Sequence, residues 1–222
     1  MTSSQEQKVG LAMASLTTFL WGFLAIAMKI AADDVPVNTI VWFRFTFAFV
    51  FLVGFVALRN PRRLRILYRP PPMGLFAAVA LTLNYLGYVG GLDRTSPSNA
   101  QVLIQLAPLM LAVAGVFIFK ERMVRVQVYG IVLALLGFAA FAYDQFESAT
   151  IVREHLLLGN AILFGAALAW ALFAVLQKLL LAKGFGPQDL NLLLYGLPAI
   201  TLWPLVDFEL LTGLSVGMWL LM

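Results

Sequence analysis

The sequence predicts an all-α integral membrane protein that folds as a multi-span helical bundle. Composition is the first reason, since 62% of the 222 residues are hydrophobic, 12% are charged, and the mean hydropathy is +0.91. A soluble domain is about 45–50% apolar and about 25% charged, so this composition excludes one. The other two reasons are the long apolar runs that recur along the chain and the uneven distribution of cations among the loops.

Apolar runs of about 18–22 residues, the length that crosses a membrane as a helix, follow one another at short intervals. They predict seven complete spans and the beginning of an eighth near residue 210. In chain order the spans are 10–31, 38–58, 73–92, 98–119, 125–143, 156–179 and 188–206. The connections are short except 59–72 and 143–155, so the sequence leaves no room for a soluble domain between spans.

The lysine and arginine residues predict how these spans are oriented. Eleven of the 15 fall on one side: Lys8, Arg59, Arg62, Arg63, Arg65, Arg69, Lys120, Arg122, Arg125, Lys178 and Lys183. Arg94 and Arg153 fall on the other side, and Lys29 and Arg44 lie within spans. Because cytoplasmic loops carry the excess of Lys and Arg, the sequence predicts a cytoplasmic N-terminus. The net charge of +4 is then explained by the membrane, and no nucleic-acid partner is expected.

Several kinds of enzyme are excluded by residues that the sequence lacks. It has no cysteine and one histidine, His155, which removes disulfide frameworks, zinc clusters and Cys/His or Ser/His catalytic dyads. It also lacks a G-x-S-x-G nucleophile motif and a pair of aspartates within a span. The sequence therefore predicts no catalytic residues, no metal site, no cofactor and no enzymatic activity.

An internal repeat emerges when the chain is shifted by 149 residues. The pairs that then coincide are Gly10 with Gly159, Ala12 with Ala161, Trp21 with Trp170, Ala25 with Ala174, and Lys29 with Lys178. The rare Trp and Lys residues favour a true repeat, and coincidence in an Ala- and Leu-rich sequence is the alternative. A true repeat would divide the chain into units 1–148 and 149–222. Five spans per unit is an odd number, so the second unit would enter from the opposite face, as in secondary transporters.

Short motifs along the chain then suggest a family. They are Trp21-Gly22 with Lys29, Arg44-Phe45, Leu83–Gly91, Thr95–Ala100, Gln105-Leu106-Ala107-Pro108, and Lys120-Glu121-Arg122 followed by Gln127 and Gly130. In order and spacing they resemble the EamA-like family of the drug/metabolite transporter (DMT) superfamily over nearly the whole chain. The resemblance implies two inverted five-helix halves around a central cavity, in a bacterial inner membrane, exporting amino acids or other small metabolites. The internal repeat, for its part, predicts that the second unit is truncated here, and that about 70 further residues would complete it, judged from the length of the first unit.

Polar and aromatic residues within the spans are the candidate substrate-binding residues, because a polar group in hydrocarbon normally faces a partner helix or a wet cavity. They are Trp21, Arg44, Asn84, Tyr88, Gln101, Gln105 and Trp170. Asn84 and Tyr88 are four residues apart, as are Gln101 and Gln105, so each pair shares one helix face. Cavity lining and hydrogen bonding between helices both remain open for Asn84 and Gln105, and hydrogen bonding is favoured for Gln101.

Three other features carry two interpretations each. Pro108 frees the carbonyl group of Ile104, which predicts a kink in that span or an acceptor for substrate. Trp21 and Trp170 lie too deep for the interfacial aromatic belt, so they are either core residues or walls of a pocket. Arg44 either extends toward the outer aqueous boundary, near the aspartates that follow the first span, or clamps a substrate carboxylate.

Taken together, the sequence predicts a secondary-type exporter of small zwitterionic or anionic metabolites that is embedded in the lipid bilayer as a multi-pass protein. The alternative, from a different functional class, is a membrane scaffold or assembly subunit that transports nothing. None of the seven predicted spans carries an acidic residue deep in the membrane, which favours facilitated diffusion or exchange over proton coupling.

Overall fold

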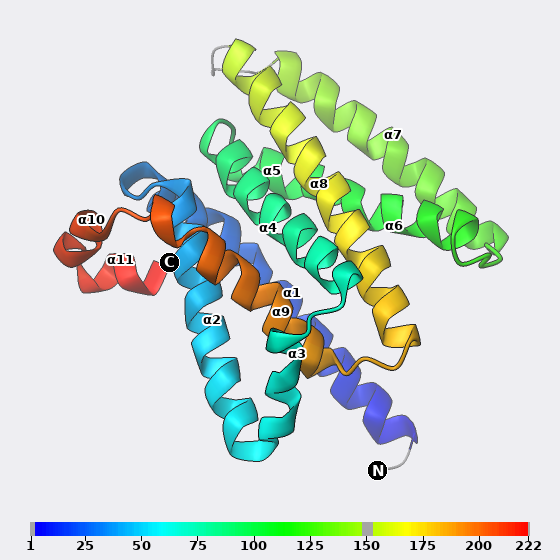
Figure 1. Cartoon of the computed structure of the whole chain (residues 1–222). Coiled ribbons are helices and arrows are strands. Elements are labelled where there is room, and N and C mark those ends of the chain that lie inside the picture. Colours follow the sequence, from blue (N-terminus) through cyan, green and yellow to red (C-terminus); the bar gives the residue numbers. More distant parts are fainter. Residues whose placement is uncertain (1–2, 148–152, 222) are drawn as a thin grey trace.

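The computed structural model describes residues 3–147 and 153–221, and these residues form helices joined by short connections (Figure 1). The helices are α1 (Ser3–Asp34), α2 (Val37–Arg59), α3 (Arg65–Tyr68), α4 (Pro72–Asp93), α5 (Pro97–Ile104), α6 (Leu106–Phe117), α7 (Arg125–Glu147), α8 (Arg153–Ala182), α9 (Pro187–Thr201), α10 (Phe208–Gly213) and α11 (Val216–Leu221). Two 3₁₀ turns, η1 (Pro61–Leu64) and η2 (Trp203–Leu205), complete the set. The described residues contain no strand, which confirms the all-α class.

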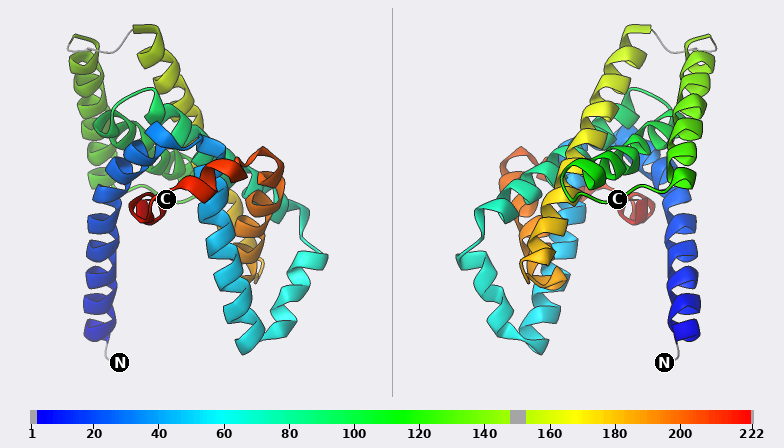
Figure 2. Two further views of the ribbon diagram at one scale, coloured as in Figure 1. Left: turned by 90° about the vertical axis from the view of Figure 1, so that its left-hand side faces the viewer. Right: turned by 90° about the vertical axis from the view of Figure 1, so that its right-hand side faces the viewer.

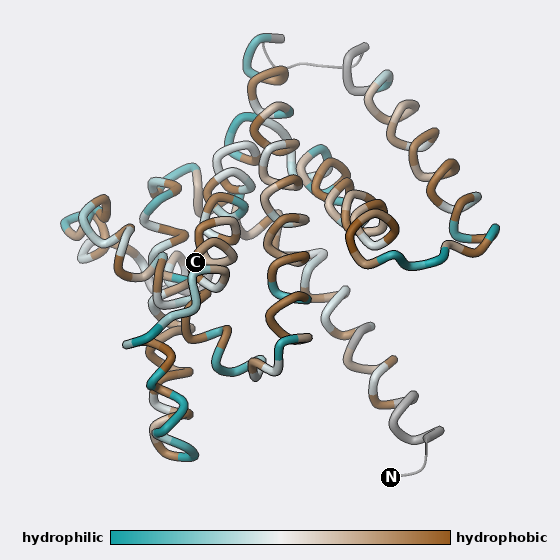
Figure 3. The backbone as a smooth tube through the Cα atoms, turned by 45° about the vertical axis from the view of Figure 1, so that its right-hand side comes forward, coloured by the Kyte–Doolittle hydropathy of each residue, from teal (hydrophilic) through white to brown (hydrophobic). Residues whose placement is uncertain are grey.

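Six described segments are long and apolar enough to cross a membrane. They are Val9–Asp34, Val37–Arg59, Pro72–Asp93, Pro97–Phe117, Arg125–Asp144 and Glu154–Ala182. These are the first six spans that the sequence predicted, displaced by a few residues at their ends. Hydrophobic residues run along the helices, and hydrophilic residues gather at their ends and in the connections (Figure 3). The chain is therefore a multi-pass membrane protein.

The seventh predicted span, 188–206, differs in the structure. Here α9 has 15 residues and reaches about 22 Å, less than the roughly 30 Å of a hydrocarbon core. The α-helix ends at Thr201, and the 3₁₀ turn η2 follows at Trp203–Leu205. Pro204 has no backbone N–H to donate to the carbonyl of Ile200, so α-helical hydrogen bonding does not continue through it. Seven of the 15 residues of α9 are buried, and the helix packs against α2 and α4, a position in which an interrupted helix is tolerated at membrane depth.

The fourth predicted span, 98–119, is interrupted at Gln105, which separates α5 from α6. The Gln105 N–H donates to the carbonyl of Val102 at 3.1 Å, so the chain makes one tighter turn there. The break lies three residues before Pro108, whose missing N–H and bulky ring weaken the preceding turn. The kink that the sequence predicted at this proline is confirmed.

The closest helix pairing joins α4 and α8, which are far apart in sequence and lie side by side (Figure 1). Glycines make the approach possible. A Cβ atom at Gly91 would lie 2.6 Å from Leu163 Cγ, and one at Gly159 would lie 2.5 Å from Thr95 Cγ2. A Cβ atom at Gly87 would meet that of Ala166 at 3.0 Å. Small residues thus let two membrane helices pack backbone against backbone.

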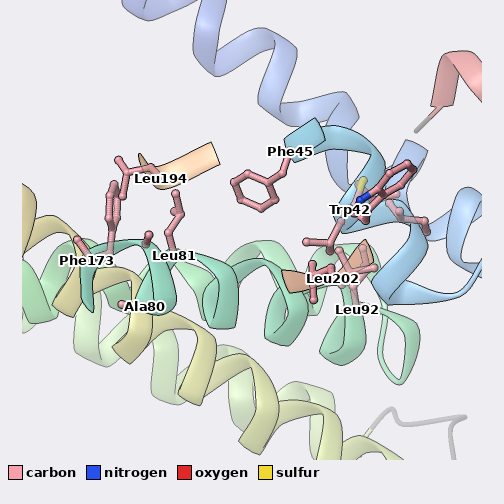
Figure 4. Close-up of a cluster of buried hydrophobic side chains, with 14 of the residues drawn as sticks. Trp42, Phe45, Ala80, Leu81, Leu92, Phe173, Leu194 and Leu202 are labelled. Carbon is pink, nitrogen blue, oxygen red and sulfur yellow. The ribbon is translucent and has the colours of Figure 1, made fainter. Parts of the chain in front are cut away.

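The buried core lies between α2, α4, α8 and α9 and holds large side chains from all four helices (Figure 4). Phe45 of α2 packs edge-on against Tyr85 of α4, with 4.8 Å between ring centroids. At the other end of the core, the Trp42 indole N–H donates to the Ala199 carbonyl at 2.9 Å. The Trp42 ring also packs against Trp203 and Phe208, both at 5.5 Å. These contacts hold α9 and the segment after it against α2.

Two helical segments extend away from this core: the N-terminal half of α1 and the whole of α7 (Figure 2). Their large apolar side chains are exposed, for example Phe19 and Leu133. Gly130, Ala134 and Gly137 of α7 have the i, i+4, i+7 spacing of a small-residue face for close packing. A Cβ atom added at Gly130 or Gly137 would meet no other atom within 4 Å among the described residues, so the close packing occurs at α4 and α8 instead.

Candidate functional site

A cavity of about 280 Å³ lies among α1, α4, α5, α6, α8 and α9. Six of the seven candidate residues line it: Trp21, Asn84, Tyr88, Gln101, Gln105 and Trp170. These residues come from four separate predicted spans, and the fold brings them to one place. Pro108 and Ile104 also line the cavity, so the break between α5 and α6 forms part of its wall.

Asn84 is held by a hydrogen bond between helices. Its Nδ2 donates to the Ala166 carbonyl of α8 at 2.9 Å, and the residue is 5% exposed. The amide thus joins α4 to α8 at the cavity wall. Both interpretations left open by the sequence apply to this residue, because it bonds a neighbouring helix and also lines the cavity.

Gln101 and Gln105 share a predicted helix face but have different surroundings. The Gln101 Nε2 donates to the Trp21 carbonyl at 3.1 Å, which ties α5 to α1. This agrees with the hydrogen-bonding role that the sequence favoured for Gln101. Among the described residues, the Gln105 side chain makes no hydrogen bond, and it is exposed at the cavity. Its amide is therefore available to a ligand.

The two tryptophans related by the predicted repeat both line the cavity, Trp21 from α1 and Trp170 from α8. Trp21 is 52% exposed, since it lies where α1 leaves the core, whereas Trp170 is partly buried. Trp170 packs edge-on against Phe173 with 6.4 Å between centroids. The cavity thus has an enclosed aromatic wall on α8 and a more open one on α1.

Arg44 does not line the cavity. It is partly buried on α2, and its Nη1 lies 3.3 Å from the Met28 sulfur of α1. Arg44 therefore lies at the α1–α2 contact and outside the lining of the cavity.

The sequence analysis missed several lining residues. Those that carry polar or aromatic groups are Tyr85, Phe173, Gln177, Asn191 and Tyr195. Gln177 follows Trp170 by seven residues, and Asn191 precedes Tyr195 by four. Both spacings place the two residues on one helix face, so the rule that paired Asn84 with Tyr88 would also have found these. Tyr85 and Phe173 gave no such signal, because aromatic residues are common in these apolar spans.

The polar and aromatic groups of the lining are amides and aromatic rings. The lining contains no ionised side chain among the described residues. Amides both donate and accept hydrogen bonds, and aromatic rings offer flat apolar surfaces. Such a lining can bind a small molecule through hydrogen bonds and stacking. The described residues also contain no cluster of metal-binding side chains.

The fold and this cavity define a class of protein, a multi-pass α-helical membrane protein with a polar and aromatic binding cavity between its helices. Comparison with known families shows to which family within this class the chain belongs. The model of the EamA-like transporter family matches residues 8–143, and the chain belongs to this family.

Individual relatives agree with this assignment. The chain is 32% identical over 207 residues to an uncharacterized transporter of Haemophilus influenzae, covering 92% of this chain and 67% of that protein. It is 33% identical over 214 residues to the uncharacterized inner membrane transporter YhbE of Escherichia coli K12, covering 95% and 66%. It is 22% identical over 201 residues to an Escherichia coli protein named "Probable amino-acid metabolite efflux pump", covering 88% and 61%. The chain spans about two thirds of the length of the first two relatives.

Proposed function

We propose that this chain forms part of a secondary transporter that exports small metabolites such as amino acids across a bacterial inner membrane. One observation carries the proposal: six candidate residues from four predicted spans line a single cavity in a chain of the EamA-like transporter family. The similarity to an inner membrane transporter and to an amino-acid metabolite efflux pump supports the location and the class of substrate.

The size of the cavity supports a small cargo. Its volume of about 280 Å³ is near the lower end of the roughly 300–1,000 Å³ found for small-molecule sites. The free amide of Gln105 and the rings of Trp21 and Trp170 provide the contacts. For the charged group of the cargo we propose Arg44 of α2, which lies outside the lining beside Met28 and would bind a carboxylate of the cargo. The proposed cargo is therefore zwitterionic or anionic.

We also propose that residues 1–148 and 149–222 belong to two inverted repeats, with the cavity between them. The positions of Trp21 and Trp170 support this, because repeat-related residues of α1 and α8 contribute to one cavity. Transporters with inverted repeats bind their substrates at the interface of the repeats, near the middle of the membrane. Alternating access would then involve motion of one unit against the other.

Direct binding tests this function against the scaffold alternative. The purified chain in detergent is titrated with a panel of labelled amino acids and other small metabolites. We expect saturable binding of at least one zwitterionic or anionic member, weakened when Trp170 is replaced by alanine. If no member of a broad panel binds while the protein remains folded, the transporter proposal fails for this chain and the scaffold alternative is supported.

The Arg44→Gln substitution tests the proposed charge of the cargo. We expect transport by the full-length carrier to fall at least tenfold at normal expression, which corresponds to about 1.4 kcal/mol. Arg44→Lys should restore only part of the activity, because an ammonium group cannot reproduce the two-pronged contact of a guanidinium. Substrates that lack a carboxylate should be affected less. Equal losses for both kinds of substrate would make Arg44 a structural residue instead.

The orientation of the chain is a further proposal, with the N-terminus in the cytoplasm. Because the sequence has no cysteine, single cysteines can report the orientation without background. A cysteine at Arg62, in the loop after α2, should resist an impermeant thiol reagent in intact cells. A cysteine at Asp34, at the end of α1, should react. Both residues are exposed in the structure, so accessibility within the protein is matched. The reverse labelling would invert the proposed direction of every span.

A further inference from the structure

A second concave surface, distinct from the cavity, lies where α2 ends and α4 begins. It encloses about 510 Å³ and is lined by Asn60, Arg62, Arg63, Arg65, Ile66, Arg69, Phe185 and Asp189. The lining residues from Asn60 to Arg69 belong to η1, α3 and the flanking connections, which pack against the beginning of α9 (Figure 1). Asp189 lies in the first turn of α9, and Phe185 lies in the connection before it. No residue is shared with the lining of the cavity. We call this surface the basic pocket.

The charges in the basic pocket are unbalanced. It contains four arginines and one carboxylate, that of Asp189. Arg63 forms an ion pair with that carboxylate, since its Nε lies 3.8 Å from Asp189 Oδ1. Its Nη1 also donates a hydrogen bond to Gln188 Oε1 at 2.8 Å. Within the described part of the chain, the other three arginines have no carboxylate partner, and all three are exposed: Arg62, Arg65 and Arg69. The pocket therefore presents three guanidinium groups to a ligand.

Apolar side chains lie beside these cations. Ile66 and Phe185 line the same pocket and are partly buried. The neighbouring spans end at Arg59 and begin at Pro72, so the pocket lies at the level where the chain leaves the hydrocarbon. At this level a phospholipid presents its phosphate to the aqueous side and its glycerol and first acyl carbons to the apolar side. The basic pocket offers guanidinium groups for the phosphate, and it offers Ile66 and Phe185 for the glycerol and the first acyl carbons.

We propose that the basic pocket binds the headgroup of an anionic phospholipid, with the phosphodiester held by Arg62, Arg65 and Arg69 and the glycerol end against Ile66 and Phe185. Guanidinium groups bind phosphate oxygens through paired, charge-assisted hydrogen bonds. Basic pockets between membrane helices are suited to anionic headgroups for this reason. The apolar residues favour a lipid over free phosphate. The site is separate from the cavity, so the proposal stands whether or not the chain transports amino acids.

The other cationic loop supplies a matched control. Lys120 and Arg122 lie between α6 and α7, and Arg125 is the first residue of α7, all three on the same predicted side of the membrane. Of these three, only Arg122 lines the gap beside that loop, together with Glu121. Neutralising the three residues changes the net charge of the chain by the same amount as neutralising three arginines of the basic pocket. A difference between the two variants therefore reports the pocket itself and not the overall charge.

The test uses the purified whole chain in a neutral detergent, titrated with phosphatidylglycerol that carries a fluorophore in its acyl chain. Combined Arg62→Gln, Arg65→Gln and Arg69→Gln should raise the apparent Kd at least tenfold. The matched Lys120→Gln, Arg122→Gln and Arg125→Gln variant should change it less than twofold. Unlabelled phosphatidylglycerol should displace the probe, whereas phosphatidylcholine and soluble glycerol 3-phosphate at the same concentration should not.

Two single substitutions test the same proposal if the triple variant does not fold. The single Arg65→Gln substitution should weaken binding several-fold, and Ile66→Ser should weaken lipid binding while all the charges remain. Equal weakening in both triple variants would reduce the effect to overall charge and overturn the proposal. Displacement of the probe by glycerol 3-phosphate as effectively as by the lipid would also overturn it, since the site would then be one for a soluble phosphate.

Discussion

Replacing Gln105 by leucine is expected to abolish substrate binding while the folded protein is retained. The Gln105 amide lies at the cavity, and it makes no hydrogen bond among the described residues. The substitution therefore removes a group that is available to the ligand and breaks no contact that supports the fold. Equilibrium binding of a metabolite that the unmodified chain binds, measured beside thermal unfolding in the same detergent, would check both parts of this expectation.

Gln101→Leu is the matched control for that experiment. It lies one helical turn earlier on the same predicted face, and its Nε2 donates to the Trp21 carbonyl of α1. Loss of one such bond between membrane helices lowers the free energy of unfolding by about 0.6–2 kcal/mol. We expect Gln101→Leu to lower stability, with a smaller effect on affinity than Gln105→Leu. If Gln105→Leu lowers the unfolding temperature and leaves affinity unchanged, then Gln105 supports the fold and the binding site lies elsewhere.

Gly159→Ala is expected to destabilise the protein through the pairing of α4 with α8. The added Cβ would lie 2.5 Å from Thr95 Cγ2 and 3.0 Å from Arg94 Cβ. Thr95 cannot easily rotate away, because it is buried and its hydroxyl donates to the Gly91 carbonyl at 2.9 Å. Overpacking of this kind lowers the free energy of unfolding by about 1–3 kcal/mol. Thermal or denaturant unfolding in detergent measures the change.

The same helix offers a control in Gly165, which has open space where a Cβ would be placed. Gly165→Ala should leave stability unchanged or raise it by up to about 1 kcal/mol, because alanine favours a helix more than glycine does. A similar response to both substitutions would mean that the close approach of α4 and α8 adds little to stability.

Most of the helices could be predicted from the sequence because a membrane span needs only local information. About twenty consecutive apolar residues must form their backbone hydrogen bonds within the segment, whatever their neighbours are. The first six spans are found for this reason. The seventh, 188–206, corresponds to α9 followed by η2, so its α-helix is shorter than predicted, and a count of apolar residues does not register the interruption before Pro204.

The candidate site could be predicted in part. A polar residue in a span must face protein or water, which is why Asn84, Tyr88, Gln101 and Gln105 could be selected without a structure. The sequence could not assign a partner to each. Nothing in the spacing distinguishes Gln101, whose amide reaches α1, from Gln105, whose amide makes no hydrogen bond among the described residues, because the two lie on the same predicted face.

The sequence by itself determined the class of this protein, its first six membrane spans, its kink at Pro108 and its family. Each depends on composition, on the order of the residues or on the covalent structure of proline. Only the tertiary structure decided which helices meet. Gly130 and Gly137 have the spacing of a packing face, and yet a Cβ added at either would meet no atom within 4 Å among the described residues, whereas Gly91 and Gly159 bring α4 and α8 together. The physical reason is that close packing requires two complementary surfaces, and one segment of sequence describes only one of them.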